Sequence, residues 1–181
     1  FTLGGLNDPF NTGSGSTSRR FQSAVDYDAD GDVDLLCRGK WYENNGDNTF
    51  TTNSIDASIS SFLGQYQYVD FDFDGDIDII DDYTNSESLL LHKNDGQQNF
   101  TETTLLANWS GALYAMADLD ADIDMDLIGY RADSVSTDGT YSLFWFENDG
   151  AQNFTEHLID SAHDTTANWL NLLAVDLDGD A

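Results

Sequence analysis

One short acidic motif occurs four times in this chain and limits how the chain can fold. Its first copy, DYDADGDVD, runs from Asp26 to Asp34 and places a carboxylate at almost every second position around a glycine. Further copies are DFDFDGDID from Asp70, DLDADIDMD from Asp118 and a shorter DLDGDA from Asp176. Carboxylates a few ångströms apart repel one another by about 1 kcal/mol per pair even in water. The fold must therefore place these acids where a cation or solvent offsets their repulsion.

The overall charge of the chain limits the classes of molecule that it can bind. Six basic residues stand against 34 acidic ones, and the formal net charge is −28. A surface this acidic repels nucleic acid and anionic lipid, and no uninterrupted apolar segment approaches the ~20 residues that a membrane helix needs. The acids alternate with apolar residues, which favours an ordered array over a disordered tail. We therefore expect no nucleic-acid partner and no membrane insertion, and we expect the acids to hold a cation.

A second motif recurs between the acidic ones and predicts hairpins. It occurs as WYENNGDNTFT from Trp41, LHKNDGQQNFT from Leu91 and FWFENDGAQNFT from Phe144. Asn-Gly and Asp-Gly steps between apolar runs supply the positive φ angles of a tight hairpin turn. The acidic motifs are framed by alternating apolar and polar residues, which is typical of strands, and no helical period occurs nearby. Each repeat is thus predicted to be strand, acidic loop, strand, connection, strand, Asn-Gly turn and strand.

The spacing of the acidic motifs predicts the architecture. Successive copies begin 44, 48 and 58 residues apart, which is the size of a four-stranded antiparallel blade of a β-propeller. A β-sandwich fits this spacing less well, because its strands would not carry the same loop at one fixed place in every fourth strand. We expect a single all-β domain over residues 1–181, with repeats over approximately 1–20, 21–55, 65–105, 112–160 and 170–181.

The two ends of the chain match parts of the repeat. Phe1-Thr2 resembles the Phe-Thr pair that follows each Asn-Gly turn, and the last residues lie inside an acidic loop. We expect about three complete blades with partial blades at both ends. Because propellers usually have about four to eight blades, the segment is expected to be a window of a larger propeller or to be completed by another chain.

The acidic loops have the composition of calcium sites. Calcium takes roughly six to eight oxygen ligands, and acids at alternate positions of a tight loop turn toward a common centre. The first, third, fifth and ninth residues would supply carboxylates, and the seventh would supply its main-chain carbonyl. An EF-hand is excluded because its loop needs a glutamate at position twelve and a helix on each side. The candidate ligands are Asp26, Asp28, Asp30, Asp32, Asp34, Asp70, Asp72, Asp74, Asp76, Asp78, Asp118, Asp120, Asp122, Asp124, Asp126, Asp176, Asp178 and Asp180.

The four loops are not equivalent. Gly31 and Gly75 give the first two loops their sharp turn, and we expect strong sites there. Ile123 replaces the glycine in the third loop, which disfavours a left-handed conformation, so weaker binding or altered geometry is expected. The fourth loop stops before its closing ligand.

With both motifs in order along the whole chain, the sequence resembles the FG-GAP or VCBS repeat family, whose calcium-binding propellers also form the head of integrin α chains. The resemblance implies a β-propeller, often of seven blades, with calcium in the acidic loops and an extracellular setting. It does not imply one function, since the family includes adhesion modules, lectins and propellers attached to secreted enzymes. Ile123 is the one departure from the loop pattern.

Other residues give weaker signals. The three histidines, His92, His157 and His163, lack zinc-ligand spacing and a neighbouring nucleophile, so no catalytic residue is expected in this segment. Trp109 and Trp169 precede loop-entering strands, where they could pack in the core or stack on a sugar, with core packing favoured. Cys37 is expected to be a buried, unreactive side chain. Glycosylation acceptor motifs occur at Asn99, Asn108 and Asn153.

Three functions remain open. The leading hypothesis is an extracellular, calcium-stabilised binding or adhesion scaffold that presents its loops to a glycan or a protein. The second is a structural subunit of an extracellular filament or surface assembly, in which neighbouring chains complete one another through the partial blades. The third is a non-catalytic propeller attached to a secreted enzyme.

Overall fold

The described part of the protein consists of β-strands and loops without a helix. The computed structural model describes residues 23–37, 39–55, 65–82, 88–109, 111–132, 141–163 and 174. Within these ranges no helix is present that could cross a membrane. The predictions for the partial blades at 1–20 and 170–181, for the acids Asp176, Asp178 and Asp180, and for Trp169 lie outside the described residues.

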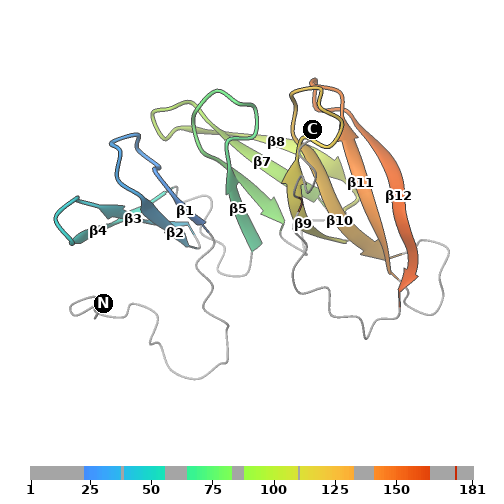
Figure 1. Ribbon diagram of the computed structural model, residues 1–181, viewed down its shortest axis with the longest axis horizontal. Coiled ribbons are helices and arrows are strands. Elements are labelled where there is room, and N and C mark those ends of the chain that lie inside the picture. The colour runs from blue at the N-terminus through green and yellow to red at the C-terminus, as the bar shows by residue number, and fades with distance from the viewer. Residues whose placement is uncertain are drawn as a thin grey trace.

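In the part of the chain that the structure describes, twelve strands form three four-stranded antiparallel sheets in chain order, as shown in Figure 1. The first sheet contains β1 (Ser23–Val25), β2 (Asp34–Cys37), β3 (Lys40–Asn44) and β4 (Phe50–Ser54). The second contains β5 (Gln65–Val69), β6 (Asp78–Asp82), β7 (Ser88–Asn94) and β8 (Phe100–Ala107). The third contains β9 (Gly111–Ala117), β10 (Asp126–Ala132), β11 (Tyr141–Asn148) and β12 (Phe154–His163). The predicted all-β class and the predicted order of strands and loops are confirmed.

The strand register is the same around each acidic loop. The last residue before the loop pairs with the ninth residue of the motif: Val25 with Asp34, Val69 with Asp78 and Ala117 with Asp126. A one-residue slip would turn every side chain of a strand to the other face of its sheet. The identical register therefore places equivalent residues of the three repeats on equivalent faces.

The Asn-Gly turn is wider than the sequence predicts. Residues 45–49 separate β3 from β4, and the loop is closed by a hydrogen bond of 3.1 Å from the Asn45 N–H to the carbonyl of Thr49. Gly46 has a positive φ of 72°, as expected, but the second positive φ falls two residues later, at Asn48. The other two hairpins repeat this pattern with Gln98 and Gln152 in the second position. The turn type follows from side-chain bonding inside the loop, which the dipeptide alone does not specify.

The three sheets stack in chain order, and the middle sheet is buried on both faces. Successive side chains of a strand point to opposite faces. In β6, Ile79 packs with Tyr27 and Trp41 of the first repeat, whereas the next residue, Ile80, packs with Leu127 of the third. Each fully buried aliphatic side chain contributes about 1.5–3 kcal/mol relative to exposure. Two apolar layers therefore hold the three sheets together.

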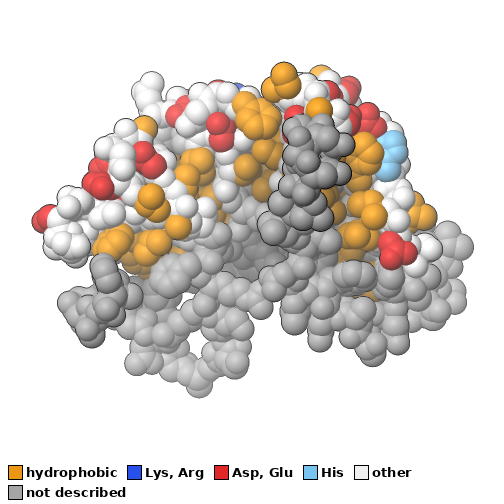
Figure 2. Space-filling model, viewed as in Figure 1, with side chains coloured by type: hydrophobic (Ala, Val, Ile, Leu, Met, Phe, Trp, Pro, Cys, Tyr) orange, Lys and Arg blue, Asp and Glu red, His pale blue; other side chains and the backbone are white. Residues whose placement is uncertain are grey.

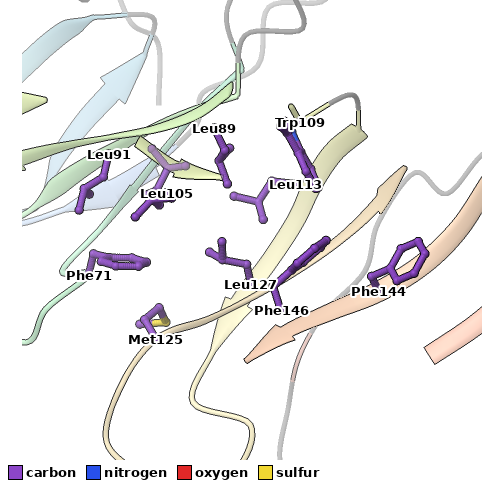
Figure 3. Close-up of a cluster of buried hydrophobic side chains, with 11 residues drawn as sticks. Phe71, Leu89, Leu91, Leu105, Trp109, Leu113, Met125, Leu127, Phe144 and Phe146 are labelled. Carbon is purple, nitrogen blue, oxygen red and sulfur yellow. The ribbon is translucent and has the colours of Figure 1, made fainter. Parts of the chain in front are cut away.

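Figure 3 shows the larger of these layers, between the second and third sheets. The indole of Trp109 lies edge-on to the ring of Phe146, with centroids 5.5 Å apart. Its N–H donates to the Oδ1 atom of the buried Asp82 at 2.7 Å, and the Leu113 N–H donates to Oδ2 at 2.7 Å. Trp109 is thus a core residue, as favoured over sugar stacking, and Asp82 links the two sheets.

The acidic loops lie on one side of the stack. The loops that follow β1, β5 and β9 all project toward the upper edge in Figure 1. The space-filling view in Figure 2 shows acidic side chains along this edge, with apolar side chains below them. The repeated fold thus brings the three described copies of the acidic motif to one rim.

Candidate metal centres

The first aspartate of each loop folds the loop around itself. The Asp26 carboxylate accepts hydrogen bonds from the N–H of Asp30 at 3.1 Å and the N–H of Gly31 at 3.0 Å. Asp70 and Asp118 accept the equivalent pair in their own loops at 3.0 to 3.2 Å. These bonds reverse the chain within five residues. The side chains at alternate positions are therefore turned toward one another.

Three groups of carboxylates result, one in each described loop. In each group the nearest carboxylate oxygens lie within 4.8 Å of one another. The members are Asp26, Asp28 and Asp30; Asp70, Asp72 and Asp78; and Asp118, Asp120 and Asp122. Such clusters of oxygen donors suit a hard cation, and calcium accepts irregular sets of carboxylates and carbonyls better than magnesium does. The donor chemistry of the loops thus fits the predicted calcium ion.

The seventh aspartate of each loop is turned away from these groups. A Cβ atom added at Gly46 would lie 2.6 Å from Oδ2 of Asp32, and one added at Gly96 would lie 2.6 Å from Oδ2 of Asp76. In the third repeat Asp124 lies close to Gly150 in the same way. The hairpin glycine is therefore needed for space as well as for its positive φ.

The ninth aspartate is buried and connects the acidic loop to the hairpin. The Oδ2 atom of Asp78 accepts the N–H of Phe71 at 3.1 Å, and its Oδ1 atom accepts the N–H of Asn94 at 2.7 Å. Asp34 and Asp126 make the same pair of bonds in their repeats. The sequence predicted only a ligand at this position. The structure shows that both carboxylate oxygens already hold main-chain donors, so the residue also has a structural role.

An asparagine that sequence analysis missed completes this connection. The Asn94 side chain donates to the carbonyl of Ile77 at 3.2 Å and accepts the N–H groups of Gly96 and Gln98 at 3.2 and 3.1 Å. Asn44 and Asn148 likewise bridge the loop and the hairpin. The signal was present, because this asparagine is identical in all three hairpin motifs. The turn alone also accounts for its recurrence, so the sequence does not single this residue out.

Lys93 was also missed, and it is the one cation that contacts an acidic group in the described loops. Its ammonium is paired with the carboxylate of Asp72 and lies 3.3 Å from Oδ2 of Asp74. The equivalent residues of the first and third repeats are Glu43 and Glu147. The Lys93 ammonium therefore neutralises part of the negative charge of the second loop.

Comparison with known proteins gives a likeness at the level of fold. No family model matches the chain, and no curated protein matches it. A lectin of Agrocybe aegerita, whose structure concerns specific recognition of non-reducing terminal N-acetylglucosamine, aligns with a TM-score of 0.55 at 20% sequence identity. The alignment covers 79% of this chain and 38% of the lectin chain. The chain therefore spans well under half the length of that lectin, and the likeness concerns the β fold.

The third loop keeps its backbone despite lacking the glycine. Ile123 has a positive φ of 71°, in the place where Gly31 and Gly75 have 96° and 97°. Its N–H still donates to Asp118 at 3.1 Å, so the backbone of the third loop follows that of the first two. A left-handed conformation costs a residue with a Cβ about 1–2 kcal/mol. The hydrogen bonds of the loop outweigh this cost. The loop therefore keeps its shape, and Ile123 holds a strained backbone conformation.

Replacing Ile123 with glycine is expected to stabilise the metal-free protein by about 0.5–1 kcal/mol. The relief of left-handed strain exceeds the greater freedom that glycine gives the unfolded chain. The side chain is exposed, so little packing is lost. Urea unfolding would measure the change, with Ile123→Ala as the matched variant that keeps a Cβ. If Ile123→Gly were no more stable than Ile123→Ala, the strain argument would be wrong.

Desolvation raises the pKa of several carboxyl groups in the described repeats, and that of three of them to about 6. The pKa of Asp78 rises to about 6, chiefly because the side chain is desolvated. Desolvation, followed by the charges of Asp82 and Glu102, raises the pKa of Asp81 to about 6. Desolvation, followed by Asp122 and the other loop acids, raises that of Asp124 to about 6. Without a cation, the folded protein therefore favours the protonated form of these groups.

In metal-free buffer the free energy of unfolding is expected to fall as the pH rises from about 4 to above 6. A folded-state pKa above the unfolded one gives stability that is complete below the unfolded pKa and is lost as the pH passes the folded pKa. One pKa unit corresponds to about 1.4 kcal/mol for a desolvated group, and solvent screening of these part-exposed carboxyls reduces the expected fall to about 1–2 kcal/mol. Urea unfolding at several pH values measures it. Asp81→Asn should flatten the profile, and stability that increased with pH would contradict this assignment.

The remaining candidate residues lie apart from the acidic groups. His92 is buried with Nε2 4.0 Å from Asp81, and His157 contacts Glu147 at 2.5 Å while stacking on Trp145. Cys37 is buried, as expected. The asparagines of the glycosylation motifs, Asn99, Asn108 and Asn153, are all exposed. The Nδ2 atoms of Asn99 and Asn153 donate to turn aspartates at 2.9 Å, and glycan attachment remains a prediction.

Proposed function

We propose that this chain is part of a calcium-stabilised β-propeller of the FG-GAP or VCBS type, which acts outside the cell as a binding scaffold for a glycan or protein ligand. The observation that carries the proposal is the repetition of one unit on three stacked sheets: the same register, the same acidic loop and the same bridge to the hairpin. A propeller repeats one four-stranded antiparallel sheet around an axis, with neighbouring sheets face to face. The stack supports that arrangement.

Calcium is proposed for the acidic loops because each loop concentrates carboxylates that nothing else in the described repeat fully neutralises. When bound, the ion would supply two positive charges that offset the repulsion among the loop acids. The groups led by Asp26, Asp70 and Asp118 would hold it, with the main-chain carbonyl of the seventh residue. The hydrogen bonds to the first aspartate pre-form the loop. Sites of this kind in extracellular modules bind at about 10⁻⁴–10⁻³ M calcium, which supports an extracellular setting.

A glycan is proposed as the ligand because the lectin with a similar fold recognises terminal N-acetylglucosamine. In that role the stacked sheets would act as a rigid frame, and the loops along one rim would meet the ligand. Metal ions would set the loop conformation, so ligand affinity and calcium would be linked. A protein ligand at the same rim is the alternative within this proposal.

Binding of short oligosaccharides would test the glycan part of the proposal. Isothermal titration with oligosaccharides ending in N-acetylglucosamine, compared with ones ending in galactose, should show binding in millimolar calcium that is lost in chelator. A variant with Asp28→Asn, Asp72→Asn and Asp120→Asn should lose both calcium and the sugar. If calcium bound while neither sugar did, the glycan ligand would be wrong and the calcium-stabilised scaffold would stand.

A structural subunit of an assembly is the second candidate. It is favoured by one observation, the exposed apolar side chains on the outer sheets at both ends of the stack.

A further inference from the structure

The first two acidic loops have the same set of candidate ligands. Both carry aspartates at the first, third, fifth, seventh and ninth positions and a glycine at the sixth. They also fold alike, since the N–H groups of Gly31 and Gly75 each donate to the first aspartate of their loop at 3.0 Å. The residue immediately before the asparagine that bridges loop and hairpin differs, however, and is Glu43 in the first repeat and Lys93 in the second. The two loops can therefore be compared for the effect of this one charge.

The side chain of Lys93 is turned toward the acidic loop of its own repeat. Lys93 lies on β7, the strand whose hairpin folds back over that loop. Its ammonium pairs with the carboxylate of Asp72 and lies 3.3 Å from Oδ2 of Asp74. Both aspartates are candidate ligands, at the third and fifth positions of the loop. An ammonium in this place competes with a metal ion for the same oxygens.

The carboxylate group of the second loop also differs from the other two in its members. In the first and third loops the group includes the fifth aspartate, which is Asp30 or Asp122. In the second loop Asp78 joins the group, and the fifth aspartate, Asp74, does not belong to it. Asp74 is one of the two carboxylates next to the ammonium of Lys93. The lysine therefore engages the oxygen donor that this group lacks.

The glutamates at the same position in the other repeats contact the last strand of their sheets. Oε2 of Glu43 accepts a hydrogen bond from Nδ2 of Asn53 at 2.8 Å. Oε2 of Glu147 lies 2.5 Å from Nε2 of His157. Glu43 still acts on the first loop through its charge, because desolvation and the loop acids raise the pKa of Asp28 most and Glu43 raises it further. The same candidate ligands thus face a negative charge in the first repeat and a positive charge in the second.

We infer that Lys93 is a built-in counter-ion of the second acidic loop, which calcium has to displace before it binds there. The inference rests on the proposed binding of calcium by the acidic loops, and it adds that the loops have unequal affinities. The ammonium repels a second cation at close range and holds carboxylate oxygens that the cation needs. The loop sequences alone predict two strong sites, so the difference comes from the hairpin. The first loop should fill at a lower calcium concentration than the second.

The exposure of Lys93 allows this exchange without a change of fold. Its side chain is 41% exposed, so the ammonium can move into solvent when an ion takes its place. In the absence of metal the ammonium offsets part of the repulsion among the loop acids, and the second loop depends less on calcium than the first. The stack would therefore respond to calcium over a wider range of concentration than loops of equal affinity would.

Main-chain amide NMR signals would report each loop separately in a calcium titration of the whole chain. The N–H groups of Gly31 and Gly75 donate to candidate ligands, so their chemical shifts should change when their own loop binds the ion. In the natural chain Gly75 should titrate with a dissociation constant about tenfold or more above that of Gly31. Lys93→Glu gives the second loop the charge of the first and should bring the two constants to within about threefold. The reverse change, Glu43→Lys, should raise the constant of the first loop alone.

Lys40→Glu is the matched control, because it makes the same change of charge at the other end of β3 from the acidic loop. Lys40 is exposed and donates to Oγ of Ser54 at 2.6 Å. Its replacement should leave both dissociation constants unchanged. Lys93→Gln removes the ammonium without adding a negative charge, so it should lower the constant at Gly75 by a smaller factor than Lys93→Glu. It also keeps the inference testable if Lys93→Glu does not fold, which the dispersion of the amide signals would show.

The titration separates this inference from the proposed function. Equal dissociation constants at Gly31 and Gly75 in the natural chain would overturn the role of Lys93 and leave the calcium sites standing. A change at Gly75 of the same size in Lys93→Glu and Lys40→Glu would do the same, since it would reflect total charge. If neither amide responded to calcium in any of these proteins, the inference and the proposed calcium sites would both be wrong.

Discussion

Removing calcium is expected to lower the melting temperature of this protein by about 10 °C or more. In chelator the carboxylates of each loop face one another without a counter-ion, apart from the Lys93 ammonium in the second loop. In millimolar calcium we expect the folded loops to bind the ion, whereas the unfolded chain, whose acids are dispersed, should not bind it. Binding to the folded state alone shifts unfolding toward higher temperature.

The size of this effect follows from mass action. Extracellular sites with dissociation constants of about 10⁻⁴–10⁻³ M, at roughly 10 mM calcium, would each add about 1.4–2.7 kcal/mol to the free energy of unfolding. Three such loops give several kcal/mol in total. For a protein of this size each kcal/mol raises the melting temperature by about 2–4 °C.

Two controls separate a specific site from general screening of charge. Magnesium at the same concentration carries the same charge but prefers a rigid octahedron of ligands, so its effect should be much smaller. The variant with Asp28→Asn, Asp72→Asn and Asp120→Asn should melt in calcium close to where the natural chain melts in chelator. Calorimetry follows all four melts. Equal stabilisation by the two metals would mean that the loops are only an acidic surface.

The strands and their order could be predicted because two local signals agree in every repeat. Alternating apolar residues mark the strands on either side of each loop, and the glycine of the hairpin motif fixes where the chain reverses. The spacing from Asp26 to Asp70 and from Asp70 to Asp118 then identifies four strands per repeat. Because the repeats share one register, a prediction made on one sheet applied to all three.

The role of the ninth aspartate could not be predicted from spacing. Within the motif Asp74 and Asp78 look alike, yet Asp74 is exposed and Asp78 is buried under the hairpin. The difference arises because β7 and its turn fold back over the loop, a contact between residues about sixteen positions apart. Sequence patterns at the scale of one loop carry no information about it. Asn94, which makes the same contact from the other side, was missed for the same reason.

The conformation at Ile123 shows the opposite case, in which a local rule was outweighed. Residue preference alone disfavours a positive φ there. The Asp118 carboxylate accepts two consecutive main-chain N–H groups, and the buried Asp126 holds the end of the loop. Together these bonds retain the backbone of the glycine-containing loops. Local preference therefore predicts the strain in this loop but not its shape.

The second large effect is expected from Asp78→Ala, which should lower the free energy of unfolding by about 3–5 kcal/mol. The substitution removes both oxygens that accept the N–H groups of Phe71 and Asn94, and it leaves two buried donors without partners. It also separates the acidic loop from the hairpin. Small domains have a total stability of about 5–15 kcal/mol, so this loss is a large share of the total.

Asp72→Ala is the comparison that separates a structural carboxylate from a metal ligand. Asp72 belongs to the same acidic group, but its side chain is exposed and pairs with Lys93. In metal-free buffer its removal should change stability little, because relief of repulsion among the acids offsets the loss of a surface ion pair worth about 0–1 kcal/mol. In calcium the Asp72→Ala variant should lose the stabilisation that calcium binding in the second loop would add. Asp78→Ala should be destabilised in both buffers.

Urea unfolding of the natural chain and the two variants, each in calcium and in chelator, gives six free energies of unfolding. These values separate a structural role of Asp78 from a role as metal ligand. If Asp78→Ala were destabilised only in calcium, the ninth aspartate would be a ligand and its main-chain hydrogen bonds would contribute little. If it is destabilised equally in both buffers, the carboxylate holds the loop and hairpin together before any ion binds. The buried position of Asp78 and its short bond to the Asn94 N–H favour the second result, since a loop held in this way is already shaped for a cation.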